Sequence, residues 1–259
     1  MSLFRLIQYF TFCCMLIPLL GSRNAGSAKM LKGKTYSLLF FLSDDQSEWS
    51  YIEKQLILQQ ITDAENWLTE QAEKYNQTLR FEHGFFGWDE DILFQKMPQG
   101  NRSGNEDVFL TNKIIQKVGY DNQNQLIDQI PADNIQLLFL FKQDGVSYAF
   151  PYSPNLSKEI FYLEGMSIYH RFNEKTPQCT SCIAHEMLHL FGAWDLYKSF
   201  QTSKAQEEQA KKLYPNSIML RTSYNIKELN IDPVTAWRIG WIKTPPTGGE
   251  FFRPALQSQ

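Results

Sequence analysis

The chain has 259 residues, of which 43% are hydrophobic and 14% aromatic, enough apolar material for one globular domain of good size. Its formal net charge is −3. Proteins that bind nucleic acids carry basic patches, and no basic stretch interleaved with aromatic residues occurs here, so we expect no nucleic-acid partner.

The first residues have the composition of a secretory signal peptide. Arg5 precedes a short apolar run at residues 6–20, and small residues are frequent in 21–28. The run is interrupted by polar residues and falls short of the ~20 residues that a membrane-spanning helix needs. We expect residues 1–28 to be a signal peptide and residues 29–259 to be a domain that is secreted or otherwise extracytoplasmic, in the periplasm or at the cell surface. No stable membrane partner is then expected after cleavage, and an uncleaved N-terminal anchor is the alternative.

The next elements alternate between strand and helix patterns. Residues 35–43 form an apolar run with turn residues at both ends, which predicts a buried strand. Residues 49–75 keep apolar side chains at helical spacing and predict a long amphipathic helix. Two further strands are predicted at residues 78–85 and 135–141, with a helix around residues 108–118 between them.

A hairpin is predicted after the third strand. Asp144-Gly145 is a pair typical of a tight turn, and it leads into a strand at residues 146–152. This arm could be a sheet edge that pairs with an extended peptide, or a plain edge strand. Residues 160–171 are rich in aromatic and β-branched side chains and predict one or two more strands.

Cys179 and Cys182 are the two cysteines that remain after residue 28. In an oxidising compartment we expect them to pair with each other, which would fix the start of the helix that follows. A Cys-x-x-Cys at a helix start can also be a redox motif, but no thioredoxin-like pattern surrounds this one.

The segment from His185 to Asp195 carries the chemistry. His185 and His189 are four residues apart, so on a helix they lie on one face and could hold one metal ion. Glu186 is displaced by about 100° around the axis, beside the metal rather than on it, where a carboxylate can take a proton from water. The surrounding residues are apolar, and burying these polar groups without partners would cost roughly 2 to 7 kcal/mol each.

A catalytic zinc site usually has a third protein ligand and an open position. Gly192 stands where a helix would end in a left-handed residue, so the chain can reverse there and bring Asp195 beneath the metal. No histidine follows His189 in the sequence. We favour Asp195 as the ligand, and the competing carboxylates are Glu207 and Glu208, on a predicted helix at 203–213, and Glu228.

The motif H-E-M-L-H-L-F-G-A-W-D, from His185 to Asp195, resembles the signature of the metzincin zinc proteases. It is similar to the variant with aspartate as third ligand, found in snapalysin-type and immune-inhibitor-A-type secreted proteases. Asp195-Leu196-Tyr197 also resembles the Asp-x-Tyr of the immune-inhibitor group. The resemblance is specific over residues 182–241, a range that includes a helix start at Asp232-Pro233.

The resemblance implies an α+β fold: a mixed twisted sheet, a long backing helix, an active-site helix and a small, mostly irregular or helical C-terminal subdomain. It also implies one catalytic Zn²⁺ and hydrolysis of a peptide or protein substrate, with Glu186 as general base. Met219 would form the hydrophobic floor of the site. Where some metzincins carry a tyrosine two residues after that methionine, this chain has Arg221, with Tyr224 nearby, and both are candidates to stabilise an oxyanion.

Three other functions stay open. The chain could be a zinc hydrolase of aminopeptidase-like type, with Glu207 or Glu208 as ligand. It could be a non-catalytic secreted binding protein that keeps a metal for structure, or the motif could be a chance occurrence in a structural domain. A purely structural metal has no use for Glu186, which argues against the second.

Overall fold

The computed structural model describes residues 27–98, 105–151, 163–199 and 201–254. Most of the predicted signal segment, residues 1–26, lies outside this part. Ala28 is fully buried in the core, and the carbonyl of Ser27 accepts a hydrogen bond from the N–H of Ile135 at 3.1 Å. The folded domain therefore includes two residues that the sequence pattern assigns to the signal peptide. In the part of the chain described, no helix is both long and apolar enough to cross a membrane.

The centre of the molecule is a curled, mixed sheet in the order β2-β1-β4-β6-β5. Strands β1, β2, β3, β4 and β6 are mutually parallel, whereas β5 and β7 run antiparallel to β6. The strands are β1 (Gly33–Asp44), β2 (Leu79–Phe86), β3 (Ile92–Phe94), β4 (Asn134–Asp144), β5 (Tyr148–Phe150), β6 (Gly165–Asn173) and β7 (Thr176–Pro177).

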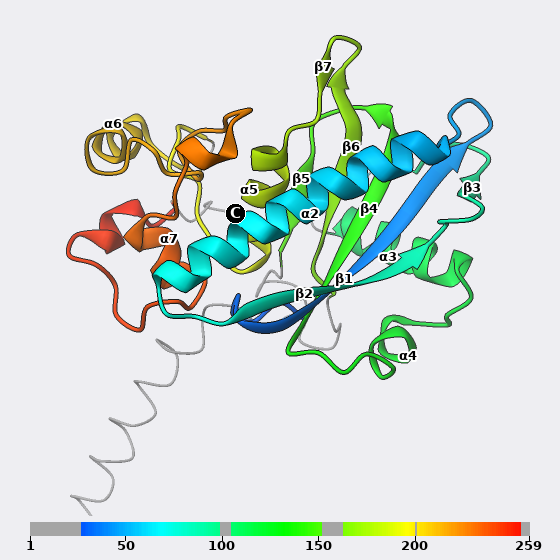
Figure 1. Cartoon of the computed structure of the whole chain (residues 1–259), viewed down its shortest axis with the longest axis horizontal. Helices are drawn as coiled ribbons and strands as arrows, with labels where there is room; N and C mark the ends of the chain where they lie inside the picture. The colour runs from blue at the N-terminus through cyan, green and yellow to red at the C-terminus, as the bar shows by residue number, and fades with distance from the viewer. Residues whose placement is uncertain (1–26, 99–104, 152–162, 200, 255–259) are drawn as a thin grey trace, which may run out of the picture.

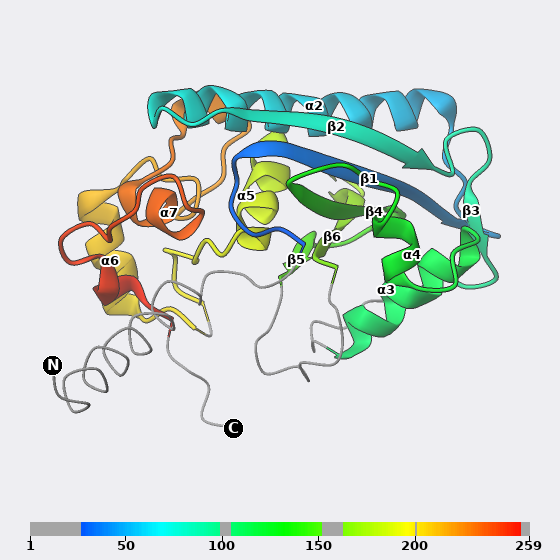
Figure 2. The same ribbon diagram turned by 90° about the horizontal axis from the view of Figure 1, so that it is seen from below.

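Helices cover both faces of this sheet, giving an α+β molecule in three layers (Figure 2). One face packs against α2 (Tyr51–Lys74) and α5 (Thr180–Leu190), and the other against α3 (Asn105–Lys117) and α4 (Gln123–Ile127). Because β1 and β4 are covered on both sides, their apolar runs are nearly continuous. The strands predicted at residues 35–43, 78–85 and 135–141 are confirmed, as are the helices predicted at residues 49–75 and around 108–118.

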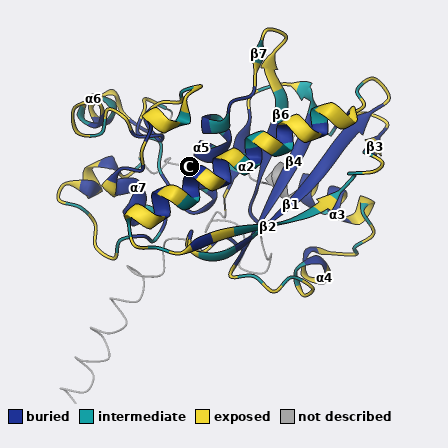
Figure 3. Cartoon of the chain, in the orientation of Figure 1, coloured by how far each residue is buried: buried dark blue, intermediate teal, exposed yellow. Residues whose placement is uncertain are grey.

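The long helix α2 lies across the sheet with one buried face and one exposed face, as Figures 1 and 3 show. It starts at a capping box: Ser50 accepts from the N–H of Glu53, and the Glu53 carboxylate accepts from the N–H of Ser50. Because of this cap the helix begins at Tyr51, two residues later than the apolar spacing predicts.

The predicted tight hairpin at Asp144-Gly145 is wrong. Strand β6 lies between β4 and β5, so the two arms do not pair, and the N–H of Gly145 donates to Arg171 on β6. Gly145 is needed for close packing instead, because a Cβ there would lie 2.5 Å from the ring of Tyr169. The resulting strand β5 is nevertheless an edge strand; Tyr152, the end of the predicted arm, lies outside the described residues.

The C-terminal part follows α5 and lies beyond one end of the sheet (Figure 1). It contains α6 (Lys204–Leu213) and α7 (Pro233–Arg238), with short 3-10 turns at Ile226–Glu228 and Gly249–Phe252 and loops between them. Helix α7 begins as predicted, with Asp232 as cap and Pro233 in the first turn. Apolar residues of this part join the same core as α2 and α5, so the two regions pack together.

Candidate metal centre

Helix α5 carries the histidines and is held firmly at its start. Cys179 is its N-cap residue and forms a disulfide with Cys182. In the first turn, Ser181 donates to the carbonyl of Ser223 at 2.7 Å and accepts from its N–H at 2.9 Å. The start of the helix is therefore tied to the segment just after Met219. Its apolar side chains are buried in the core, namely Ile183, Ala184, Met187, Leu188 and Leu190.

The end of α5 is a Schellman motif centred on Gly192. This glycine has φ 90°, a conformation that disfavours residues with a Cβ. Its N–H donates to the carbonyl of His189, and the N–H of Ala193 donates to Leu188. The chain therefore reverses at Gly192, as the sequence predicts, and residues 192–195, which we call the ligand turn, bring Asp195 back to the two histidines.

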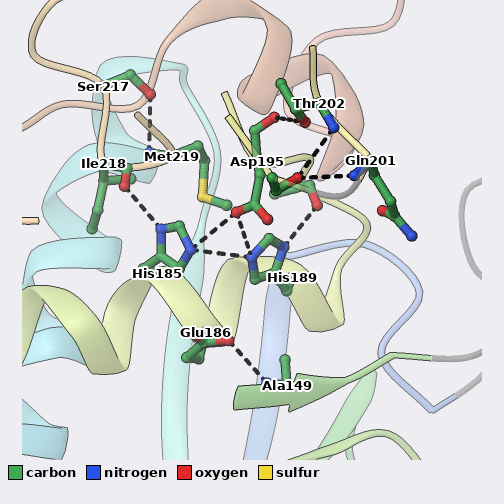
Figure 4. A network of polar contacts seen from close by, with 12 residues as sticks. Ala149, His185, Glu186, His189, Asp195, Gln201, Thr202, Ser217, Ile218 and Met219 are labelled. Carbon is green, nitrogen blue, oxygen red and sulfur yellow. Dashed lines mark hydrogen bonds and ion pairs between the residues drawn. The ribbon is translucent and has the colours of Figure 1, made fainter. Parts of the chain in front are cut away.

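The two histidines and Asp195 converge at one point (Figure 4). The Nε2 atoms of His185 and His189 lie 3.1 Å apart. Oδ1 of Asp195 lies 3.3 Å from the first and 3.1 Å from the second. Three potential ligand atoms from the helix and the ligand turn thus face a common centre.

Backbone carbonyls orient both rings. Nδ1 of His185 lies 2.9 Å from the carbonyl oxygen of Ile218, and Nδ1 of His189 lies 3.0 Å from that of Ala193. If each Nδ1 carries the proton that such a bond needs, a neutral ring turns its Nε2 lone pair toward Asp195. Asp195 Oδ1 is buried and lies within 3.3 Å of both Nε2 atoms. In that state three acceptor atoms face one another, an arrangement that a positive charge between them would stabilise.

Without a metal, a proton supplies this charge. Burial acts to lower the pKa of His189, but the hydrogen bond and charge of Asp195 outweigh it and raise that pKa to about 9. Burial acts to raise the pKa of Asp195, but its hydrogen bonds to His185 and His189 hold it well below its usual range. The three side chains together therefore favour a positive charge, and His185, His189 and Asp195 could hold a metal ion.

The rival carboxylates lie elsewhere. Glu207 and Glu208 are on α6, where both pair with Lys211 at 3.0 and 3.5 Å. Glu228 is exposed and accepts from Ser223 and Asn225. Within the described residues, none of the three joins the group formed by the histidines and Asp195.

Glu186 lies beside this group and not within it. Its Oε2 accepts a hydrogen bond from the backbone N–H of Ala149, on edge strand β5, at 2.9 Å (Figure 4). The side chain is partly buried. On α5 the carboxylate of Glu186 is therefore directed away from His185 and His189, the two histidines of the group that could hold a metal ion.

Met219 lies beside the His185–Asp195 pair, and its side chain is fully buried (Figure 4). Its carbonyl accepts the N–H of Leu196 at 2.8 Å, and its N–H donates to Ser217 at 3.1 Å. The methionine segment thus supports the chain just after the ligand turn.

Within the described part of the chain, neither candidate for oxyanion stabilisation forms a hydrogen bond or an ion pair with the cluster. Arg221 is exposed and donates to the carbonyl of Pro215 and to Asn216. Tyr224 is 73% exposed. The tyrosine found beside the cluster is Tyr197, whose ring centroid lies 6.0 Å from that of His185.

Several groups that shape the centre have no signal in the sequence. The orienting carbonyls of Ala193 and Ile218 and the N–H of Ala149 are backbone groups, which every residue has. Arg238 donates to the carbonyl of Gly192 from a helix 46 residues further along the chain. Only Tyr197 has a visible signal, its place two residues after Asp195.

No protein-family model matches the chain, and no curated protein is similar enough to it to count as a relative.

Proposed function

We propose that this protein is a secreted zinc-dependent endopeptidase with a metzincin-like catalytic domain. The observation that carries the proposal is the arrangement of four polar side chains. Ligand atoms of His185 and His189 on α5 and of Asp195 on the ligand turn converge on one point, whereas Glu186 on α5 lies apart from them. A site that only stabilised the fold would need the first three groups alone.

The spacing of the ligand atoms fits zinc. Zinc binds nitrogen and carboxylate oxygen at about 2.0 to 2.2 Å in a tetrahedral arrangement, which puts neighbouring ligand atoms about 3.3 to 3.6 Å apart. The three separations here are 3.1, 3.1 and 3.3 Å. Two imidazoles and one carboxylate are also a normal catalytic zinc set that leaves a position open.

When bound, zinc would supply Lewis-acid polarisation of the scissile carbonyl and of a water molecule. His185, His189 and Asp195 would hold it. Glu186 would accept a proton from the attacking water and then deliver it to the leaving amine. The hydrogen bond from Ala149 keeps its carboxylate turned toward β5, the sheet edge along which an extended peptide could lie.

Secretion is part of the same proposal. It is supported by the signal-like composition of residues 1–26 and by the disulfide between Cys179 and Cys182, a bond that persists in oxidising compartments.

The test is metal content and peptide cleavage measured on the same preparations. The full chain, produced in a secreting host, should contain about one zinc per molecule by elemental analysis and should cleave members of a peptide library. A chelator should stop cleavage, and added zinc should restore it. Asp195→Ala should lose the metal and the activity, whereas Glu208→Gln should keep both.

The outcomes separate the alternatives. Zinc-loaded protein that cleaves no peptide would favour a structural metal. Protein that takes up no metal would end the proposal. An Asp195→Ala variant that retains zinc, together with loss of zinc in Glu208→Gln, would favour the aminopeptidase-like alternative.

A further inference from the structure

We propose that Arg238, the last residue of α7, is a positioning residue of the metal centre. It holds the ligand turn in the shape that presents Asp195 and orients His189. This inference rests on the metal centre proposed above, but it concerns a residue that the zinc-binding motif does not contain.

Arg238 contacts the ligand turn at two points. Its Nε donates to the carbonyl of Gly192 at 2.9 Å. Its guanidinium carbon lies 4.2 Å from the ring centroid of Trp194, in the geometry of a cation–π contact. A planar guanidinium that both stacks and donates fixes direction as well as distance, so it limits how Gly192 and Trp194 can move relative to α7.

Two groups that matter for metal binding lie close to these contacts: Ala193 stands between Gly192 and Trp194, and Asp195 comes after Trp194. The carbonyl of Ala193, between them, accepts from Nδ1 of His189 at 3.0 Å. Asp195 follows Trp194 directly, and its Oδ1 lies 3.1 Å from Nε2 of His189. A shift of the ligand turn would therefore move one ligand and release the ring of another.

The same short helix also supports the other histidine. Asp232, the N-cap of α7, accepts from the hydroxyl of Ser217 at 2.7 Å in a buried contact. Ser217 precedes Ile218, whose carbonyl orients His185. The two ends of α7 thus reach the two sides of the metal centre, and Arg238 is its link to the ligand turn.

An alternative role is purely structural. The rings of Trp194 and Trp237 lie 5.7 Å apart with Arg238 over both, so its loss could lower stability alone. A structural residue would change the melting temperature and leave the metal affinity of the folded protein as it was. A positioning residue would change that affinity, and also the spectrum of a metal that reports ligand geometry.

The experiment compares the full chain with Arg238→Gln, Arg238→Lys and the control Arg253→Gln. Arg253 is exposed and pairs with Glu250. At a temperature where circular dichroism shows every variant folded, we would measure the zinc dissociation constant by chelator competition and the visible spectrum of the Co²⁺-loaded protein. Replacement of groups that orient metal ligands typically weakens metal binding by about 10- to 100-fold. We expect that loss and an altered cobalt spectrum for Arg238→Gln, partial recovery for Arg238→Lys, and no change for Arg253→Gln.

Equal zinc affinity and an equal cobalt spectrum in Arg238→Gln and the wild type would overturn the inference and leave the proposed function standing. A wild type that binds neither metal would overturn both. If Arg238→Gln does not fold, Arg238→Lys and Trp194→Leu decide the matter by the same two readouts. Unchanged values in both would then count against a positioning role.

Discussion

Glu186 on α5 accepts a hydrogen bond from the backbone N–H of Ala149 on β5, with 2.9 Å between Oε2 and N. In an antiparallel pair, successive residues turn their backbone groups alternately toward the partner strand and away from it. The N–H of Ala149 therefore points away from β6, toward the free side of the sheet edge. This contact joins the proposed base to the strand along which a substrate backbone could lie.

Replacing this carboxylate should separate metal binding from turnover. Glu186→Gln keeps an oxygen for the N–H of Ala149 but cannot accept a proton at neutral pH. We expect kcat to fall by about 10²- to 10⁴-fold, with zinc content unchanged. Peptide cleavage and elemental analysis on one preparation would check this. Turnover near the wild-type value would assign the base to another group.

The glycine of the ligand turn should affect both stability and metal binding. Gly192 has φ 90°, and Gly119, in a turn after α3, has φ 96° with no atom within 4 Å of the place that a Cβ would take. An alanine in such a conformation costs about 1 to 2 kcal/mol. We expect Gly192→Ala and Gly119→Ala to lose similar stability in denaturant titrations. Only Gly192→Ala should also raise the zinc dissociation constant. An equal rise for Gly119→Ala would contradict the prediction that Gly192 affects metal binding through the ligand turn.

The disulfide should contribute to stability by closing a short loop. Cys179 and Cys182 are 3 residues apart, and chain-entropy arguments give about 2 kcal/mol for so short a ring. Cys179→Ser with Cys182→Ala keeps an oxygen acceptor at the N-cap. We expect this variant to unfold at lower denaturant concentration than the wild type. Reductant should lower the unfolding midpoint of the wild type to that of the variant and leave the midpoint of the variant unchanged. A fall in both midpoints would mean that the reductant does not act through this disulfide.

A buried pair between the sheet and α2 should make stability depend on pH. Nε2 of His83 lies 2.6 Å from Oε2 of Glu65, and this hydrogen bond raises the pKa of His83 above 6.5. Because the folded pKa is the higher one, the pair's contribution is complete below pH 6.5 and is lost as pH rises through the folded pKa. The stability difference between wild type and His83→Gln should therefore be larger at pH 6 than at pH 9.

Denaturant titrations with a chelator in every sample would check this, because binding of a metal by His185, His189 and Asp195 would otherwise add its own pH dependence to the stability. A difference that is equal at both pH values, or larger at pH 9, would contradict the prediction.

Lys54 should be among the costlier residues to replace. Its ammonium is nearly buried, pairs with Asp91 at 2.7 Å and donates to the carbonyls of Gly87 and Trp88. Lys54→Met would leave a largely buried carboxylate without its cation, a change that typically costs about 3 to 5 kcal/mol. Chemical denaturation should show this loss, with little change for the exposed Lys74→Met. A cost below about 1 kcal/mol, the range of an exposed ion pair, would contradict the prediction. It would mean that water or another group replaces the ammonium of Lys54 as the partner of Asp91.

Much of the architecture can be predicted from the amino-acid sequence. The apolar runs of β1 and β4 predict buried strands because parallel strands covered on both faces cannot alternate with polar residues. The pattern of α2 predicts a helix because one face must be buried. Asp144-Gly145 led to a wrong prediction, because the sequence cannot distinguish a glycine that allows close packing against Tyr169 from a glycine that forms a tight turn.

In the candidate site, features that depend on residues close together in the sequence could be predicted, and features that depend on distant segments could not. His185, Glu186 and His189 share one helix, so spacing along the sequence determines which of them face the same side, and Gly192 marks the reversal that follows. These relationships are local, and helix geometry is the same in every protein. The sequence could therefore predict that the two imidazoles share one face of the helix and that the carboxylate of Glu186 lies beside that face.

The remaining features depend on which distant segments meet. Carbonyls from Ile218 and Ala193 orient the rings, the N–H of Ala149 holds Glu186, and Arg238 braces the ligand turn. Backbone groups carry no signature in the sequence, and an arginine on a remote helix looks like any other surface residue. Packing creates these contacts, because α5 and α7 bury apolar side chains in one core and Ala149 of β5 packs against it, which brings the polar groups within hydrogen-bond distance.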